Sequence, residues 1–278
     1  MKNIPEPALS QCHIGWTWRL AVLFILALSD PVPAQFTYTN NVGGYCDLSG
    51  YTGSGGDVEI PPSIDGYIVS TIRPFAFASN TNITSITFSP KGQVIRVYHD
   101  AFSHCSALTR LKIPDHVWFI DANGFSGCNN LTNVILGSGI SMLGTEAFAY
   151  CDKLKSVYFR GNAPSNNNDA FSADFGATIY HLPSATGWPA VPNEWQYRPT
   201  AYWLPEMMND ESLGVQNGTF GFTISWVHDQ TVVVDACTNI ENPVWTPLET
   251  ITLGFDTLYF NDLEWADYPG RFYRLRSP

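Results

Sequence analysis

The side chains best suited to acid–base or metal chemistry are the histidines, and they do not form a set. His99 and His104 flank Asp100 in one part of the chain. Catalysis needs a base within hydrogen-bond reach of a partner, and zinc needs clustered His or Cys ligands. The other histidines beyond residue 34 share no spacing with this pair: His116, His181 and His228. No nucleophile-elbow, zinc-protease or phosphate-loop motif occurs. We therefore predict that His99, His104 and Asp100 are solvated, and we predict no enzymatic activity, no cofactor and no metal.

Aspartates near the C-terminus are a second candidate for metal chemistry. Asp229, Asp235 and Asp256 offer the hard oxygen ligands that calcium prefers. Their spacing is irregular, whereas calcium loops place their ligands at regular intervals. We interpret them as turn-forming residues.

Five cysteines follow residue 34, and three of them are spaced 23 residues apart: Cys105, Cys128 and Cys151. If equivalent residues lie on stacked coils about 4.8 Å apart, their Cα atoms suit a disulfide but their parallel Cβ atoms are slightly too far apart. We predict that this ladder serves as small buried hydrophobic residues. A bridge between two of its members is the alternative.

The cysteine spacing belongs to a longer repeat. Phe102, Phe125, Phe148 and Phe171 also recur every 23 residues, and apolar positions between them keep the same phase. A fixed period of this length indicates a solenoid. Ala-Phe-x-x-Cys-x-x-Leu has the three- and four-residue spacings of a short helical turn, and Leu-x-Ile-Pro alternates like a strand that a proline ends. A second short strand has inward residues three apart, such as Val117 and Ile120.

These motifs resemble the BspA-type leucine-rich repeats of bacterial and protist surface proteins. The resemblance spans residues 35–203 and includes four coils with the pattern I-x-x-x-A-F-x-x-C-x-x-L-x-x-I-x-I-P. Asn80 replaces the cysteine in the first full coil, and Gly124 replaces one alanine. The resemblance implies a right-handed solenoid with parallel strands, but no particular ligand.

Apolar side chains at outward positions of the coils are the candidate binding residues. Trp118 and Phe119 lie between the inward Val117 and Ile120, where neighbouring coils have Ile95/Arg96 and Ser141/Met142. Exposed apolar patches mark interaction sites. We predict one such patch on one solenoid face, formed by Trp118, Phe119, Ile135, Met142 and Tyr158. The alternative is that a terminal cap or the C-terminal module covers these residues.

Composition excludes some partners, and the N-terminus predicts export. The net charge of -11 leaves no basic field for nucleic acid. Arg19 precedes an apolar run at residues 20–28, and residues 32–34 offer a cleavage site, so residues 1–34 are a predicted signal peptide. The run is shorter than the roughly 20 residues that span a bilayer. We expect a secreted or cell-surface protein without an integral membrane span.

The rest of the chain divides into a solenoid, a linker and a second module. We predict the solenoid with its caps over residues 35–204, an acidic linker over 205–214 and an antiparallel β-sandwich over 215–278. The stretch 233–275 resembles a terminal module of secreted repeat proteins from Verrucomicrobia-like bacteria. The fold class is mainly β, with short helical turns.

Two functions remain open from the sequence. The first is noncatalytic binding of a protein or glycan at the cell surface through the solenoid face. The second is a structural spacer or matrix component that the C-terminal module anchors. The sequence does not indicate an oligomeric state.

Overall fold

The computed structural model describes residues 35–165, 169–174, 176–227, 230–254 and 257–278. The predicted signal peptide lies outside these residues, as do Asp229 and Asp256. No helix in the described ranges is long and apolar enough to cross a membrane. Their one helix is a 3-10 turn at Trp265–Asp267, so the regular secondary structure of the described residues is almost entirely β.

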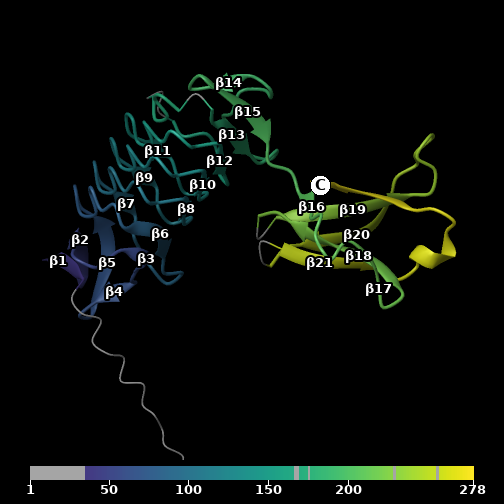
Figure 1. The fold of residues 1–278 in the computed structure, drawn as a ribbon, viewed down its shortest axis with the longest axis horizontal. Coiled ribbons are helices and arrows are strands. Elements are labelled where there is room, and N and C mark those ends of the chain that lie inside the picture. Colours follow the sequence, from purple (N-terminus) through teal and green to yellow (C-terminus); the bar gives the residue numbers. More distant parts are fainter. Residues whose placement is uncertain (1–34, 166–168, 175, 228–229, 255–256) are drawn as a thin grey trace, which may run out of the picture. The chain divides into compact units, whose positions relative to one another are not determined.

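Stacked coils of residues 35–204 contribute their strands to two sheets (Figure 1). Sheet A has the order β1-β2-β5-β7-β9-β11, and β4 pairs with β5. Its strands from β2 onward in this order are parallel, while β1 and β4 pair antiparallel with their neighbours. The strands are β1 (Phe36–Asn41), β2 (Tyr45–Tyr51), β4 (Ser63–Ile64), β5 (Tyr67–Ile72), β7 (Arg96–Val97), β9 (Phe119–Ile120) and β11 (Met142–Leu143).

Sheet B lines the same core with the order β14-β15-β13-β12-β10-β8-β6-β3. All its neighbours are parallel except the terminal β14–β15 pair. The strands are β3 (Gly56–Ile60), β6 (Ile83–Phe88), β8 (Arg110–Ile113), β10 (Asn133–Leu136), β12 (Ser156–Phe159), β13 (Thr178–His181), β14 (Glu194–Trp195) and β15 (Arg198–Tyr202). The predicted solenoid of parallel strands is confirmed.

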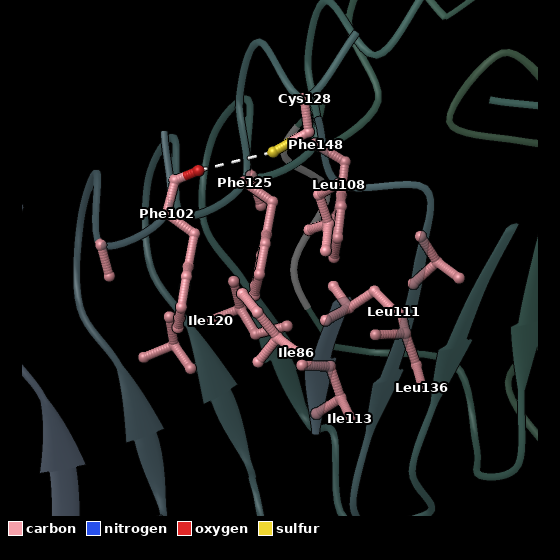
Figure 2. Packing of buried hydrophobic residues seen from close by; sticks show 14 of the residues in the cluster. Ile86, Phe102, Leu108, Leu111, Ile113, Ile120, Phe125, Cys128, Leu136 and Phe148 are labelled. Carbon is pink, nitrogen blue, oxygen red and sulfur yellow. Dashed lines mark hydrogen bonds between the residues drawn. The ribbon is translucent and has the colours of Figure 1, made fainter. Parts of the chain in front are cut away.

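The recurring phenylalanines form a continuous stack inside the solenoid. The ring centroids of Phe102 and Phe125 lie 4.9 Å apart, and the angle between the two ring planes is 2°. For Phe125 and Phe148 the centroid distance is 5.3 Å and the interplanar angle is 4° (Figure 2). Phe77 and Phe171 extend the stack at its two ends. The rings stack because each coil repeats the same backbone path. Side chains from both sheets surround them in one hydrophobic cluster.

The Ala-Phe-x-x-Cys segments are consecutive turns rather than assigned helices. The amide of Phe102 donates to the Gly124 carbonyl of the next coil, and that of Phe125 donates to the Ala147 carbonyl. Residues with positive φ recur around these segments, including Asp100 at 55° and His104 at 60°. Such backbone suits Asp, Asn, His and Gly better than bulky residues. The turns thus join neighbouring coils by hydrogen bonds as well as by packing.

The cysteine ladder is buried, and its thiols are free. The Cys128 Sγ donates to the Phe102 carbonyl oxygen of the preceding coil over 3.4 Å, which Figure 2 marks. Cys105 and Cys151 repeat this contact with the Phe77 and Phe125 carbonyls. Burial raises the pKa of the Cys105 thiol to about 12 and that of Cys128 well above its usual value. The prediction of buried small residues is confirmed.

Asp174 occupies the cysteine position of the last coil. Its Oδ1 accepts the Cys151 amide N–H over 2.7 Å. Burial raises its pKa to about 7, although this hydrogen bond and nearby Arg198 lower it. Beyond this coil, Trp188 and Trp195 pack against Phe159 with ring centroids 4.7 and 5.6 Å away. These two tryptophans cover the C-terminal end of the solenoid core.

The C-terminal module contains two antiparallel sheets. Sheet C has the order β16-β18-β17, with β21 also paired to β18, and sheet D has the order β20-β19-β22. Phe222, Val234 and Phe260 belong to a core that both sheets share, as in a sandwich. The strands are β16 (Glu206–Met207), β17 (Gly214–Gln216), β18 (Thr219–Ser225), β19 (Thr231–Cys237), β20 (Thr246–Thr252), β21 (Thr257–Asp262) and β22 (Phe272–Arg276).

Two details of the module bear on the sequence predictions. Residues 205–214 contain β16, which pairs with β18, so this segment contributes to sheet C. The domain boundaries themselves stay predictions. Asp235 lies within β19, where its carboxylate accepts hydrogen bonds from Arg274 and Arg276 at 2.9 Å each. Its interpretation as a turn residue is therefore wrong, because Asp235 lies within a strand and its buried carboxylate pairs with these two arginines.

Candidate functional site

The outer face of sheet A carries three of the five predicted binding residues. In each coil the inward residues are three apart, and the two residues between them are directed away from the core. Val117 and Ile120 are fully buried, whereas Trp118 and Phe119 are half-buried. Phe119 pairs in register with Met142 of β11, whose exposed fraction is 39%. Trp118, Phe119 and Met142 therefore lie on one face.

Arg96 joins this group from the neighbouring strand β7. It lies in register with Phe119. Its guanidinium carbon is 4.5 Å from the centroid of the Trp118 ring and 5.8 Å from that of Phe119. The Trp118 and Phe119 rings are themselves 5.6 Å apart. Cation–π contacts of this kind hold a half-exposed arginine in place. We call Arg96, Trp118 and Phe119 the arginine–aromatic cluster.

Ile135 and Tyr158 lie elsewhere, on β10 and β12 of sheet B. The prediction that all five residues share one solenoid face is wrong, because the two short strands of each coil enter different sheets. The Tyr158 ring stacks on Tyr180 at 4.8 Å and contacts Trp203 at 4.7 Å. Trp203 also packs against the core of the C-terminal module. Tyr158 is therefore covered by other aromatic residues, as the alternative interpretation expects for the whole patch.

An open hollow of about 480 Å³, lined mainly by polar and charged residue types, lies beside the arginine–aromatic cluster on sheet A. Such a volume is within the range of small-ligand sites, about 300–1,000 Å³. Tyr98 links the two features, because its hydroxyl accepts a hydrogen bond from Arg96 Nη1 over 3.5 Å. We call this hollow the sheet A groove, and it is lined by Asp47, Arg73, Pro74, Tyr98, His99 and Asp121.

The register of the strands explains why these residues converge. The amide of Arg73 donates to the Leu48 carbonyl, that of Tyr98 to Ile72, and that of Asp121 to Val97. Arg73, Tyr98 and Asp121 therefore occupy the same position in three successive coils. They lie far apart in the sequence but one strand spacing apart in space, about 4.8 Å. A ladder of different polar side chains results.

The carboxylates of the groove keep hydrogen-bonding capacity. Asp47 Oδ1 accepts the Ser70 hydroxyl over 3.1 Å, and Asp121 Oδ1 accepts the Ala122 amide over 2.7 Å. Among the described residues, the second oxygen of each carboxylate has no protein donor. The exposed Arg73 guanidinium likewise has no acceptor in the described part of the chain. The groove thus offers both donors and acceptors to a ligand.

The histidines behave differently from an acid–base set. His99 Nδ1 lies 3.2 Å from Asp100 Oδ2, and its side chain is 45% exposed. The exposed Phe75 ring packs nearly perpendicular to the His99 ring, and the two ring centroids lie 5.2 Å apart. The His99–Asp100 contact joins adjacent residues at the rim of the groove. Within the described residues, no three His, Cys, Asp or Glu side chains are grouped as a metal site.

Sequence reasoning found the aromatic half of this face and missed the polar half. Asp47, Arg73 and Tyr98 are not apolar, and Asp47 lies in the irregular first coil. A possible signal was the repeat alignment itself, which places Arg73, Tyr98 and Asp121 directly after the inward Ile72, Val97 and Ile120.

Comparisons with known proteins concern the solenoid. The chain is similar to a leucine-rich repeat protein of T. pallidum, with 20% identity, a TM-score of 0.46, and coverage of 53% of this chain and 69% of that chain. It is similar to one from Bacteroides ovatus at 25% identity and a TM-score of 0.39, covering 54% of this chain but 47% of that chain. A leucine-rich cell surface protein from Faecalibacterium prausnitzii shares 15% identity at a TM-score of 0.25, with coverage of 54% and 70%.

No curated protein matches the chain. A family model does match, over residues 59–183 and in six copies. The match ends before the C-terminal module, so the resemblance of that module to those of Verrucomicrobia-like bacteria stays a prediction. The matched family is described as the BspA type leucine-rich repeat region, which is the repeat that the Ala-Phe-x-x-Cys pattern predicts.

Proposed function

We propose that the chain is a noncatalytic binding protein of the cell surface, whose ligand docks on the outer face of sheet A. The observation that carries this proposal is the adjacency of the arginine–aromatic cluster and the sheet A groove. Aromatic and arginine side chains are enriched among residues that dominate binding energy. The predicted signal peptide and the matched repeat family support a location outside the cytoplasmic membrane. The polar groups of the groove supply specificity beside the apolar contacts.

The test compares variants on the two sheets of the solenoid. We expect Trp118→Ala combined with Phe119→Ala to abolish binding of the full chain to isolated cell envelopes. The reason is that both rings are half-exposed and face away from the core. Ile135→Ala is the matched control, because it removes a half-buried apolar side chain from sheet B. Pull-down with envelopes measures binding, and circular dichroism melting measures folding.

Three outcomes contradict the proposal. Binding that survives the double substitution but is lost in Ile135→Ala would place the ligand on sheet B. Loss of the folded state in the double variant would show that Trp118 and Phe119 act in the core. An unchanged affinity in all variants would also contradict a role for either face.

A further inference from the structure

The sheet A groove carries information about the ligand through its charge balance. Asp47 and Asp121 contribute two carboxylates to the lining and Arg73 contributes one guanidinium group, while the guanidinium of Arg96 lies next to the lining residue Tyr98. His99 belongs to the lining, and its Nδ1 lies 3.2 Å from the carboxylate of Asp100 at the rim of the groove. Counted together with Arg96 and Asp100, this region has three carboxylates and two guanidinium groups, so it does not attract a polyanion over distance. An anionic ligand is therefore not expected, whereas an uncharged ligand can contact the carboxylate and guanidinium groups alike.

The unused hydrogen-bonding groups indicate a ligand rich in hydroxyls. A hydroxyl both donates and accepts, so one kind of group satisfies a carboxylate oxygen and a guanidinium N–H alike. Hydrogen bonds to charged groups are stronger than neutral ones, by roughly a factor of two. Asp47, Arg73 and Asp121 present these charged partners along the groove. Neighbouring hydroxyls on a sugar ring are spaced to reach such partners together.

The repeat of the solenoid suits a repeating ligand. Arg73, Tyr98 and Asp121 follow each other at one strand spacing, about 4.8 Å. This spacing is close to the advance of one pyranose unit along an extended polysaccharide chain. The Tyr98 ring lies among the polar groups, and the half-exposed Phe119 ring lies beside them. Aromatic rings bury large apolar areas against the C–H face of a sugar.

A protein partner fits the groove less well. The buried centres of protein interfaces are depleted in charged residues. Three of the six groove residues are charged, namely Asp47, Arg73 and Asp121. In addition, the guanidinium of Arg96 already occupies one approach to Trp118, at 4.5 Å from its ring centroid. A deep apolar pocket for a protein side chain is therefore not what this face offers.

We propose that the sheet A groove binds an uncharged oligosaccharide, with Asp47, Arg73 and Asp121 as its hydrogen-bonding residues and Tyr98 as a stacking surface. This inference rests on the proposed function, because it names the ligand class for the same face. It assigns separate tasks to the two features. The groove recognises hydroxyl groups, and the arginine–aromatic cluster extends the apolar contact area.

The test measures retardation of the full chain in native gels containing a neutral mannan, xylan or β-glucan, together with a printed array of neutral and anionic oligosaccharides. Asp47→Asn combined with Asp121→Asn removes both charges, and asparagine keeps the oxygen that accepts the internal hydrogen bonds. We expect at least a tenfold loss of affinity for the neutral glycan. Glu59→Gln is the control, because it makes the same change at an exposed position of β3 in sheet B. Its affinity should equal that of the unsubstituted protein.

The outcomes separate this inference from the proposed function. Binding of proteins or of anionic glycans alone, if sensitive to Trp118→Ala, would overturn the assignment to an uncharged oligosaccharide and leave the binding face in place. Binding of a neutral glycan that both carboxylate substitutions leave unchanged would overturn the role of the groove. Failure to bind any neutral glycan on the array would overturn the inference itself. Tyr98→Phe adds a further check, since it removes the hydroxyl but should retain stacking.

Discussion

Replacing Phe125 by alanine tests whether the phenylalanine stack holds the coils together. Its ring is fully buried and lies between Phe102 at 4.9 Å and Phe148 at 5.3 Å, almost parallel to both. Truncating a buried phenylalanine costs about 3–5 kcal/mol. Each stacked pair adds about 0.5–1.5 kcal/mol beyond its buried area. Because Phe125→Ala removes two stacked pairs, we expect the free energy of unfolding to fall by an amount in the upper half of the truncation range, about 4–5 kcal/mol.

Phe125→Leu separates packing from stacking. Leucine keeps most of the buried carbon but loses both ring contacts, so we expect a loss of about 1–3 kcal/mol in the free energy of unfolding. Phe171 stacks on one phenylalanine, at 5.4 Å, and Phe171→Leu should cost less. Ile95→Ala is the control, because Ile95 is 42% exposed. Its effect should remain within about 0.5 kcal/mol.

Urea unfolding followed by far-ultraviolet circular dichroism gives these free energies. Neighbouring coils depend on each other in a solenoid, so damage at the centre should lower the stability of the whole stack. The slope of the unfolding free energy against urea should stay constant across the series. A cost below about 1 kcal/mol for Phe125→Ala, at an unchanged slope, would refute the view that this ring is central to the core.

Three further predictions concern buried polar atoms. The pKa of Asp174 is raised by burial to about 7 from an ordinary 3.8, so folding binds a proton between these values and stability falls as pH rises through this window. Asp174→Asn keeps the oxygen that accepts the Cys151 amide hydrogen bond. The melting temperature of this variant should exceed that of the unsubstituted protein at pH 8 but not at pH 4. An equal gain at both pH values would contradict the raised pKa of Asp174. The thiols of Cys105, Cys128 and Cys151 should resist a thiol reagent until urea unfolds the chain. The reason is that these thiols are buried and that burial raises their pKa values. Rapid labelling of the native protein would contradict the burial of the cysteine ladder. Thr71 Oγ1 is buried without a hydrogen-bond partner among the described residues. Thr71→Val should therefore raise the free energy of unfolding in urea by up to about 1–3 kcal/mol. A lower free energy of unfolding would show that the Thr71 hydroxyl makes a stabilising hydrogen bond.

The repeat made the solenoid predictable from sequence. Phe102, Phe125 and Phe148 keep a constant spacing, and a constant spacing forces equivalent residues onto neighbouring coils. For the same reason the burial of Cys128 and the outward position of Phe119 followed from their places in the repeat. Asp235 shows the opposite case. Its carboxylate pairs with Arg274 and Arg276 of the adjacent strand β22, and no local pattern identifies partners 39 and 41 residues away.

The sequence by itself determined which residues of each coil face the core, because burial of apolar side chains imposes the 23-residue period. It did not determine which outward residues meet. That depends on the path of the backbone, which sends the two strands of each coil into different sheets and thereby separates Trp118 from Tyr158. The strand register then brings Arg73, Tyr98 and Asp121 together, since side chains one coil apart become neighbours only when the coils stack. The aromatic residues were visible in the sequence, whereas the polar groove beside them exists only in the tertiary structure.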